Sequence, residues 1–429
     1  MKNLINFNVS DGISLNYIED KKFKTTTLFA AIHTPLKRET ATLNALLPLV
    51  LKRGSNAVPT FDALERRLAG LFGASINCNV IKRGENQILY FELSVLSDNF
   101  APDKSKILNE ASKLLLDIIF NPYTEDGGFS KEYTESEKEN LSDMIKATVN
   151  DKQNYALWRL YETMCEGEAF GIHELGVLED VSKIDAKALY EHYKNIISTS
   201  VIDIFVCGNA DIYSFKAELE NQLKGIKRGN CFSYPETVMH PKRAEVLKTV
   251  EEFEANQAKL SLGLTTGVES DDDLYYSLLV ANSIFGSGVH SKLFNNVREK
   301  LSLAYYAFSR LTRKKGIMLV GMGIEEANFK KAFDETLLQL NLLKQGEISD
   351  DEFSGAVRFL TNNARSAADS QMGMIMFYLD NKIDGADLSI EDYCKKIESV
   401  TKQGVVEAVK NTELDAIYFL KGKENGEEE

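Results

Sequence analysis

Apolar residues recur with two different periods along the chain, and these periods predict its helices and strands. In the segment 41–55, five apolar residues stand at the spacing of one packed helical face. They are Leu43, Leu46, Leu47, Val50 and Leu51. Residues 74–96 instead alternate around the sequence "KRGEN", which predicts a β-hairpin. Further helices are expected at 60–73, 103–120 and 130–165, and a buried strand is expected in "SVIDIFVCGN".

The helix predicted at 41–55 contains a proline, which is unusual within a helix. Pro48 removes a backbone donor and crowds the preceding turn, at a cost of about 3 kcal/mol. Gly54 follows the last apolar residue, at the position where glycine commonly ends a helix. The pattern therefore predicts a helix whose packing tolerates an internal proline.

The order of segments is repeated in the second half of the chain. The sequence "VLKRGSNAVPTFDALERRLAGLFGASINC" matches "SIFGSGVHSKLFNNVREKLSLAYYAFSRL". Gly54 corresponds to Gly286 and Arg66 to Arg298, with one shift, because 286 − 54 = 232 and 298 − 66 = 232. This repeat predicts two homologous α+β lobes, each with helices on a mostly antiparallel sheet. The expected division is a lobe at 1–225, an irregular linker at 226–245 and a second lobe at 246–429.

Charge and cysteine content narrow the class of protein. The 429 residues carry 50 basic and 64 acidic side chains, a net charge of −14, which argues against nonspecific binding to nucleic acid or to anionic lipid. No apolar run is long enough to predict a membrane span. Five cysteines are scattered without a C-x-x-C pair, as expected for reduced thiols in a cytoplasmic protein. They are Cys78, Cys165, Cys207, Cys231 and Cys394.

The residues alone indicate no catalytic machinery. The chain has five histidines, and neither H-E-x-x-H nor H-x-x-E-H occurs. The sequence "HELGV" (173–177) has Val177 where a second helical ligand would stand. His192 is interpreted as an ordinary helix-surface residue, and Ser287 and Ser291 have no histidine partner at a fixed spacing.

The segment 285–309, "FGSGVHSKLFNNVREKLSLAYYAFS", resembles a conserved stretch of the insulinase, pitrilysin and mitochondrial-processing-peptidase family. The glycine loop and the elements corresponding to RLF, REK and LAY occur in the family's order. Active members of that family are zinc peptidases with an inverted H-x-x-E-H motif. The resemblance implies two homologous lobes of the processing-peptidase type, each with antiparallel sheets covered by helices and joined by a linker.

The same resemblance implies that the zinc site has been lost. When the glycine that follows the family's metal helix is placed on Gly54, the metal positions fall on Ala45, Pro48 and Leu49. None of these side chains binds Zn²⁺ or transfers a proton. The third ligand, a glutamate, is expected near 141–148, where Asp143 is the one carboxylate. The chain is therefore expected to hold no cofactor of its own, with zinc in a partner.

The second lobe keeps the family's pair for binding the substrate carbonyl. This pair corresponds to Arg298 and Tyr305, and the resemblance implies that the loop Gly286, Ser287 and Gly288 lines the peptide groove. A guanidinium and a phenol can both donate to a carbonyl and to its developing oxyanion. In the first lobe Arg66 keeps the arginine, but Gly73 stands at the tyrosine position.

These expectations favour one function and leave two others open. The chain is interpreted as the zinc-less subunit of a cytoplasmic, bacterial-type heterodimeric metalloendopeptidase, inactive alone, with a homologous zinc-binding subunit as partner. A homodimer is the other assembly considered, and a peptide is the expected substrate. The alternatives are a structural scaffold and a peptide-binding module without turnover.

Overall fold

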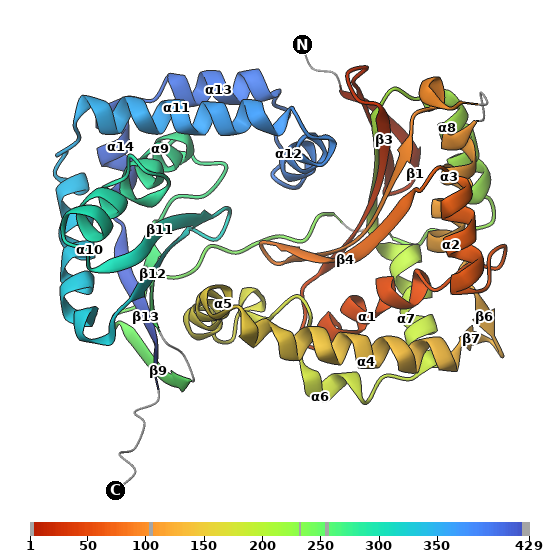
Figure 1. The fold of residues 1–429 in the computed structure, drawn as a ribbon, viewed down its shortest axis with the longest axis horizontal. Coiled ribbons are helices and arrows are strands. Elements are labelled where there is room, and N and C mark those ends of the chain that lie inside the picture. The colour runs from red at the N-terminus through yellow and green to blue at the C-terminus, as the bar shows by residue number, and fades with distance from the viewer. Residues whose placement is uncertain (1–3, 103–105, 231–232, 254–256, 423–429) are drawn as a thin grey trace, which may run out of the picture. The chain divides into compact units, whose positions relative to one another are not determined.

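A computed structural model describes residues 4–102, 106–230, 233–253 and 257–422 of the chain. Cys231 lies outside the described residues, as do short parts of both expected lobes and of the expected linker. The chain forms two compact units, which are shown as ribbons in Figure 1. The first comprises residues 1–146, 172–236 and 367–383, and the second comprises 147–171, 237–366 and 384–429.

The first unit is built on a mixed six-stranded sheet with the order β1-β2-β8-β3-β5-β4, in which β2 and β8 are parallel and the other neighbours antiparallel. Its strands are β1 (Leu4–Ser10), β2 (Ile13–Glu19), β3 (Thr25–Pro35), β4 (Ser75–Arg83), β5 (Asn86–Leu96), the short pair β6 (Thr124–Glu125) and β7 (Gly128–Phe129), and β8 (Val201–Gly208). Its helices are α1 (Ala41–Leu51), α2 (Phe61–Gly70), η1 (Asp98–Phe100), α3 (Ile107–Phe120), α4 (Lys131–Ala147), α6 (Leu178–Val181), α7 (Ala186–Thr199), α8 (Ile212–Gln222) and α12 (Gln371–Ile383).

The second unit is built on a five-stranded sheet with the order β11-β12-β10-β13-β9, in which only β13 and β9 are parallel among the described residues. Its strands are β9 (Leu247–Phe253), β10 (Ala258–Thr265), β11 (Ala304–Thr312), β12 (Ile317–Ile324) and β13 (Glu413–Gly422). Its helices are η2 (Thr148–Asn150), α5 (Lys152–Met164), η3 (Ala169–Gly171), α9 (Tyr275–Gly286), the π-helix η4 (Leu293–Lys300), η5 (Glu326–Asn328), α10 (Phe329–Lys344), α11 (Asp350–Ala367), α13 (Ile390–Glu398) and α14 (Lys402–Val409).

The two sheets have the same strand order, which supports the duplication read from the sequence. The run β2-β8-β3-β5-β4 in the first unit corresponds position by position to β9-β13-β10-β12-β11 in the second. The single parallel pair falls at the same place in both runs. The predicted fold class, helices on mostly antiparallel sheets in two homologous lobes, is therefore confirmed.

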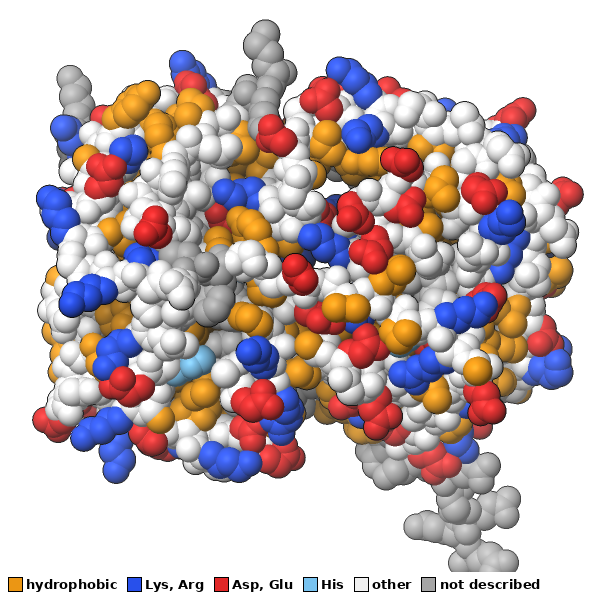
Figure 2. All heavy atoms as spheres, turned by 180° about the vertical axis from the view of Figure 1, so that it is seen from behind, with side chains coloured by type: hydrophobic (Ala, Val, Ile, Leu, Met, Phe, Trp, Pro, Cys, Tyr) orange, Lys and Arg blue, Asp and Glu red, His pale blue; other side chains and the backbone are white. Residues whose placement is uncertain are grey.

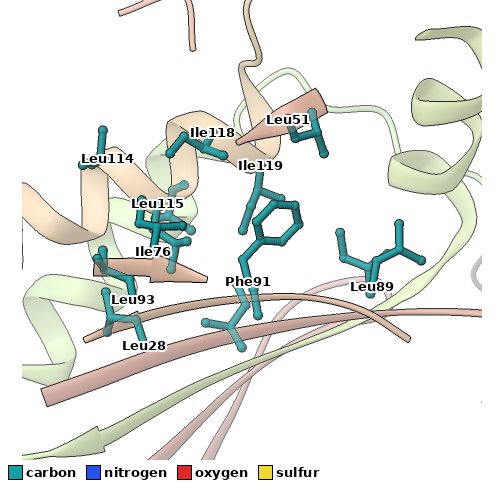
Figure 3. Close-up of a cluster of buried hydrophobic side chains, with 14 of the residues drawn as sticks. Leu28, Leu51, Ile76, Leu89, Phe91, Leu93, Leu114, Leu115, Ile118 and Ile119 are labelled. Carbon is teal, nitrogen blue, oxygen red and sulfur yellow. The ribbon is translucent and has the colours of Figure 1, made fainter. Parts of the chain in front are cut away.

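Alternate residues of each strand face opposite layers of helices. On one face of the first sheet, Phe91 of β5 packs among leucine and isoleucine side chains of α3, as Figure 3 shows for Leu115 and Ile119. On the opposite face, Phe29 and Phe205 contact α12, which comes from the second half of the chain. Both faces of the first sheet are therefore covered, one by helices close in sequence and one by a distant helix.

The second unit repeats this arrangement with a helix from the first half of the chain. One face of its sheet packs on α9, α10 and α14. The other face packs on α5 through Leu157, Leu160 and Met164. Each unit thus takes one covering helix from the other half of the sequence.

Paired carboxylates connect these exchanged helices to the sheets. In the first unit Lys382 of α12 lies 2.9 Å from one carboxylate oxygen of the buried Asp203, and the other oxygen accepts a hydrogen bond from Tyr234 at 2.6 Å. In the second unit the half-buried Glu251 of β9 accepts hydrogen bonds from Tyr155 and Arg159 of α5, at 2.8 and 3.1 Å. A buried carboxylate costs free energy unless it is paired, so the contact with Asp203 helps to fix where α12 docks.

Two features differ from the simple picture given by the sequence. The single helix expected at 130–165 is two helices, α4 and α5, and the side chain of Asp151 caps the second one by accepting from the Asn154 amide at 3.1 Å. The chain passes from the first unit to the second within the expected linker, between Glu236 and Thr237. We keep the boundaries 1–225, 226–245 and 246–429 as a prediction about the duplicated halves, because the exchange of α5 and α12 does not test it.

Acidic and basic side chains are interspersed on the face of the molecule shown in Figure 2. None of the helices in the described ranges combines the length and the apolar character needed to cross a bilayer.

Candidate functional site

Helix α1 carries the positions at which zinc ligands were expected to be missing. Ala45 and Pro48 are buried, and Leu49 is half-buried against the hydrophobic core of the first unit. Pro48 lies inside the helix, and its carbonyl accepts hydrogen bonds from the Lys52 amide at 3.1 Å and from the Cys78 thiol at 3.2 Å. This part of α1 therefore serves packing, with apolar groups at all three positions.

The polar groups of α1 are used internally, in a buried hydrogen-bond network around Asn44. The Asn44 amide nitrogen donates to Thr34 at 3.1 Å and to Gln87 at 2.8 Å. Its carbonyl oxygen accepts from Nε2 of His192, on α7, at 2.7 Å. Burial lowers the pKa of His192 to about 4, so the ring is neutral at pH 7. His192 is thus a half-buried partner of α1, which corrects its interpretation as an ordinary surface residue.

Helix α4 provides no carboxylate in place of the family's third ligand. The side chain of Asp143 is 82% exposed and lies 3.9 Å from Lys146, one turn further along the same helix. The buried carboxylate of this helix, Glu137, forms an ion pair with Arg53. The first unit therefore combines apolar metal positions with acidic residues that are exposed or already paired.

In the second unit the expected pair is brought together by two departures from regular structure. The first is the π-helix η4, which carries Arg298 and occupies eight residues. Such helices are rare and occur frequently at functional sites. Arg298 donates from Nε to the Tyr305 carbonyl at 3.0 Å, and its guanidinium lies 4.7 Å from the centre of the Phe294 ring. This side chain is 40% exposed and closes the turn between η4 and β11.

The second departure is a β-bulge at Tyr305. In the ladder between β11 and β12, Ala304 pairs with Ile324 and Tyr306 with Gly323, so Tyr305 is the extra residue. A bulge changes the direction of a side chain and often lies next to an active site. Tyr305 is 57% exposed, and its hydroxyl donates to the carboxylate of Glu325. This hydrogen bond to Glu325 raises the pKa of Tyr305.

The glycine-rich loop is attached to the same strand. The Ser287 hydroxyl donates to the Ser309 carbonyl of β11 at 3.0 Å and accepts from the Asn282 amide at 2.7 Å. Gly286 packs so closely on Ser309 that a Cβ would overlap the Ser309 backbone nitrogen. Gly288 has a φ of +121°, a conformation that favours glycine. The structure thus places Gly286 and Ser287 against β11 and Gly288 beside His290 and Phe359, and the role of the three in lining a peptide groove stays a prediction.

The corresponding positions of the first unit lack the pair. Arg66 is exposed and donates to the Asp62 carbonyl of its own helix at 3.2 Å. Gly73 has a φ of +76° and carries no side chain. Two exposed donors, a guanidinium and a phenol joined by a backbone hydrogen bond, therefore occur at this register in the second unit and not in the first.

Sequence reasoning did not identify Glu325 as a neighbour of this pair. The residue belongs to no motif and follows β12, whose last residue, Ile324, pairs with Ala304. The signal that could have found it is the register of the predicted hairpin, which places the end of one strand beside the start of the other.

Comparison with known proteins identifies the class to which this fold belongs. The family described as "Peptidase M16 inactive domain" matches residues 183–360. Over 413 residues the chain is 32% identical to a Bacillus subtilis protein named "Probable inactive metalloprotease YmfF", and the match covers 96% of each chain. The chain therefore belongs to the M16 peptidase family, as the resemblance in the sequence indicated. It is a homologue of a metalloprotease named as inactive, which agrees with the absence of a catalytic zinc site in α1.

Solved structures agree with this assignment. A conserved protein from Enterococcus faecalis V583 superposes with a TM-score of 0.89 at 30% sequence identity, and the match covers 99% of this chain and 100% of that one. A structure described as a peptidase M16 inactive domain from Pseudomonas fluorescens superposes with a TM-score of 0.79 at 18% identity, with 98% of both chains covered. The second of these supports the fold alone.

Proposed function

We propose that this chain is the zinc-less subunit of a heterodimeric metallopeptidase and supplies Arg298 and Tyr305 to a zinc site carried by a homologous partner. In this proposal the partner brings the H-x-x-E-H helix and the glutamate ligand. This chain binds the carbonyl of the peptide bond that is cleaved. Alone, it is inactive.

The observation that supports this proposal most is the exposed pair itself. Arg298 and Tyr305 lie on consecutive elements and are joined by a 3.0 Å hydrogen bond, and both side chains are substantially exposed. Nε of Arg298 is engaged by the Tyr305 carbonyl and Nη1 lies 3.3 Å from a carboxylate oxygen of Glu299, so Nη2 is the nitrogen offered to a substrate in the first instance. A permanently charged donor beside a neutral donor suits an oxyanion that develops during peptide hydrolysis.

Glu325 regulates one half of this pair. Its carboxylate accepts from the Tyr305 hydroxyl, so that hydroxyl must leave Glu325 in order to donate to a substrate carbonyl. Binding of a peptide is then in competition with an internal hydrogen bond. This competition predicts a weaker ground-state affinity than the two donors would give alone.

We also propose a cytoplasmic location for the complex. No disulfide joins Cys78, Cys165, Cys207 and Cys394 within the described part of the chain, as expected in a reducing compartment.

The test is a substitution series in the assembled complex. The chain is co-expressed with a homologue from the same host that carries H-x-x-E-H, the complex is purified, and cleavage of a fluorogenic peptide library is measured. Arg298→Ala is expected to lower kcat/KM by about 100- to 1,000-fold, the effect of removing one oxyanion donor. Arg66→Ala is the matched control, since it removes an exposed arginine at the same register of the repeat and is expected to leave the rate unchanged.

Two outcomes would contradict the proposal at different points. If the complex cleaves peptides and Arg298→Ala behaves like Arg66→Ala, the pair has no role in catalysis. If no combination with a zinc-bearing homologue cleaves any peptide, the subunit function is wrong and the scaffold alternative gains support.

A further inference from the structure

A second group of chemically reactive side chains lies in the second unit, away from the Arg298 and Tyr305 pair. Cys165 ends α5, Glu168 follows it in the loop before η3, and His240 comes from the segment that leads into β9. One sulfur, one oxygen and one nitrogen atom of these residues all lie within 4.8 Å of one another. No spacing motif in the sequence connects this group, since His240 lies far along the chain from the other two.

We propose that Cys165, Glu168 and His240 bind one Zn²⁺ ion with a structural role, distinct from the catalytic zinc that the proposed function assigns to the partner. A thiolate, a carboxylate and an imidazole are the ligand types that zinc takes in proteins. His240 Nδ1 lies 2.6 Å from a Glu168 oxygen and 4.0 Å from the Cys165 sulfur. Tetrahedral zinc separates such ligand atoms by about 3.3–3.6 Å, so each of these two distances needs to change by less than about 1 Å.

The other nitrogen of His240 already has the partner that a metal-binding histidine requires. Nε2 lies 3.3 Å from a carboxylate oxygen of Asp415, on β13, and both side chains are almost fully buried. A carboxylate in this position holds the ring with Nδ1 toward the metal and raises its basicity. The second Asp415 oxygen is buried without a hydrogen-bond partner among the described residues. Asp415 is therefore assigned as the positioning residue of this site.

Glu168 also has a cation beside it. The ammonium of the buried Lys315 lies 2.5 Å from one carboxylate oxygen of Glu168. The other oxygen of Glu168 is the one that faces Nδ1 of His240, so it is the oxygen that would bind the metal.

The position of the site indicates what the ion would do. It would join the end of α5 to the segment around His240, which is itself held to the turn between β11 and β12 by a 2.9 Å hydrogen bond from the His240 amide to the Lys315 carbonyl. Three protein ligands leave the fourth position of tetrahedral zinc for a small molecule such as water. Because the side chains of Cys165 and His240 are buried, the site stabilises the second unit and takes no part in the proposed peptide cleavage.

The full chain, purified without a histidine tag and equilibrated with excess zinc before dialysis, is expected to retain about one zinc per chain by elemental analysis. Cys165→Ser and His240→Ala are expected to lose at least about 90% of it. Cys394→Ser is the matched control, a buried thiol of the same unit that contacts the Thr361 carbonyl, and is expected to keep the metal. Asp415→Asn is expected to weaken binding about 10- to 100-fold, the usual effect of removing such a partner.

A measurement on the unaltered chain keeps the proposal testable if a variant fails to fold. Substitution with Co²⁺ is expected to give the near-ultraviolet thiolate-to-metal absorption band, and the affinity for the metal is expected to fall as the pH drops, since ligands bind metal in their deprotonated forms. A wild-type chain that shows no thiolate band with excess Co²⁺, or zinc that remains in both ligand variants, would overturn the proposal. Neither result bears on the Arg298 experiment, which reads peptide cleavage.

Discussion

The same stretch of the repeat has a regular backbone in the first unit and an irregular one in the second. In the first, α1 and α2 are ordinary α-helices, and the Thr60 side chain caps α2 by accepting from Ala63 at 3.2 Å. In the second, the counterpart of α2 begins at the same register, because 293 − 61 = 232, but it is a π-helix and is followed by a β-bulge. Irregular backbone is found where exposed donors have been kept.

The comparison also shows what both halves lack. The metal positions Ala45, Pro48 and Leu49 correspond to 277, 280 and 281 in α9, after addition of 232, and these are Ser277, Val280 and Ala281. Neither helix offers a zinc ligand at those positions. The two units therefore share a scaffold, and the exposed pair of donors occurs in only one of them.

The largest expected effect comes from exchanging the residues at position 48 and its counterpart. Val280→Pro places a proline inside α9 and is expected to lower the free energy of unfolding by more than about 3 kcal/mol, because a backbone donor is lost and the preceding turn is crowded. Pro48→Ala in α1 is expected to raise it by about 1 kcal/mol, since the lost packing offsets part of the gain. Denaturant unfolding of both variants measures the difference. A Pro48→Ala variant no more stable than the unaltered chain would show that α1 is not strained by its proline.

A pH effect should distinguish the histidines that pack beside the two helices. Burial lowers the pKa of His192 to about 4, below its unfolded value of 6.5, so its contribution is present above pH 6.5 and is lost as the pH falls toward 4. The loss is expected to reach roughly 3 kcal/mol. His192→Gln, which keeps a donor for Asn44, should remove this dependence. His290→Gln, at a less buried ring beside Ser283, should change it less.

Substitution of Gly54 and Gly286, the glycines shared by the two halves of the repeat, tests which element each helix end contacts. A Cβ at Gly286 would overlap the backbone of Ser309 in β11, whereas a Cβ at Gly54 would lie 2.5 Å from the Val58 carbonyl in the following loop. Both alanine variants are expected to lose about 1–3 kcal/mol of stability through overpacking. Only Gly286→Ala should also lower peptide cleavage by the complex, because it displaces the strand that carries Tyr305. If complexes with Gly286→Ala and with Gly54→Ala cleave peptides at the same rate, the position of β11 does not matter for the site.

The smallest effect is expected at Glu325. Glu325→Gln removes the carboxylate that raises the pKa of Tyr305, so the phenol is expected to titrate closer to pH 10. The freed hydroxyl should lower KM for peptides a few-fold with little change in kcat. Labelling the tyrosine rings with ¹³C allows the Tyr305 titration to be followed by NMR, with Tyr305→Phe used to assign its signal. An unchanged titration would mean that the hydrogen bond to Glu325 does not persist in solution.

Much of the fold could be predicted because it is encoded locally. The alternation around "KRGEN" gave the β4–β5 hairpin, and the constant shift between Gly54 and Gly286 gave the duplication. The exchange of α5 and α12 could not be predicted, since an amphipathic pattern reveals an apolar face but not which sheet will cover it. The break at Asp151 was missed although five consecutive polar residues, 150–154, interrupt the apolar pattern there.

Only part of the candidate site could be predicted from the sequence. Arg298 and Tyr305 were proposed from a family resemblance, and the structure adds that they touch, which seven positions of separation could not establish. The π-helix and the bulge could not be predicted, because both depend on the backbone hydrogen-bond register that the folded structure adopts. The partners of His240 are distant in sequence, so no spacing rule could bring them together.

The exchange of covering helices has a consequence for the order in which the protein matures during synthesis. Phe29 and Phe205 have emerged from the ribosome long before Ile375 and Leu379, the α12 residues that shield them. Until α12 has been synthesised, the nascent first unit therefore exposes a hydrophobic sheet face. Such a surface is prone to aggregate and to bind chaperones. A truncated first half would remain permanently in that immature condition.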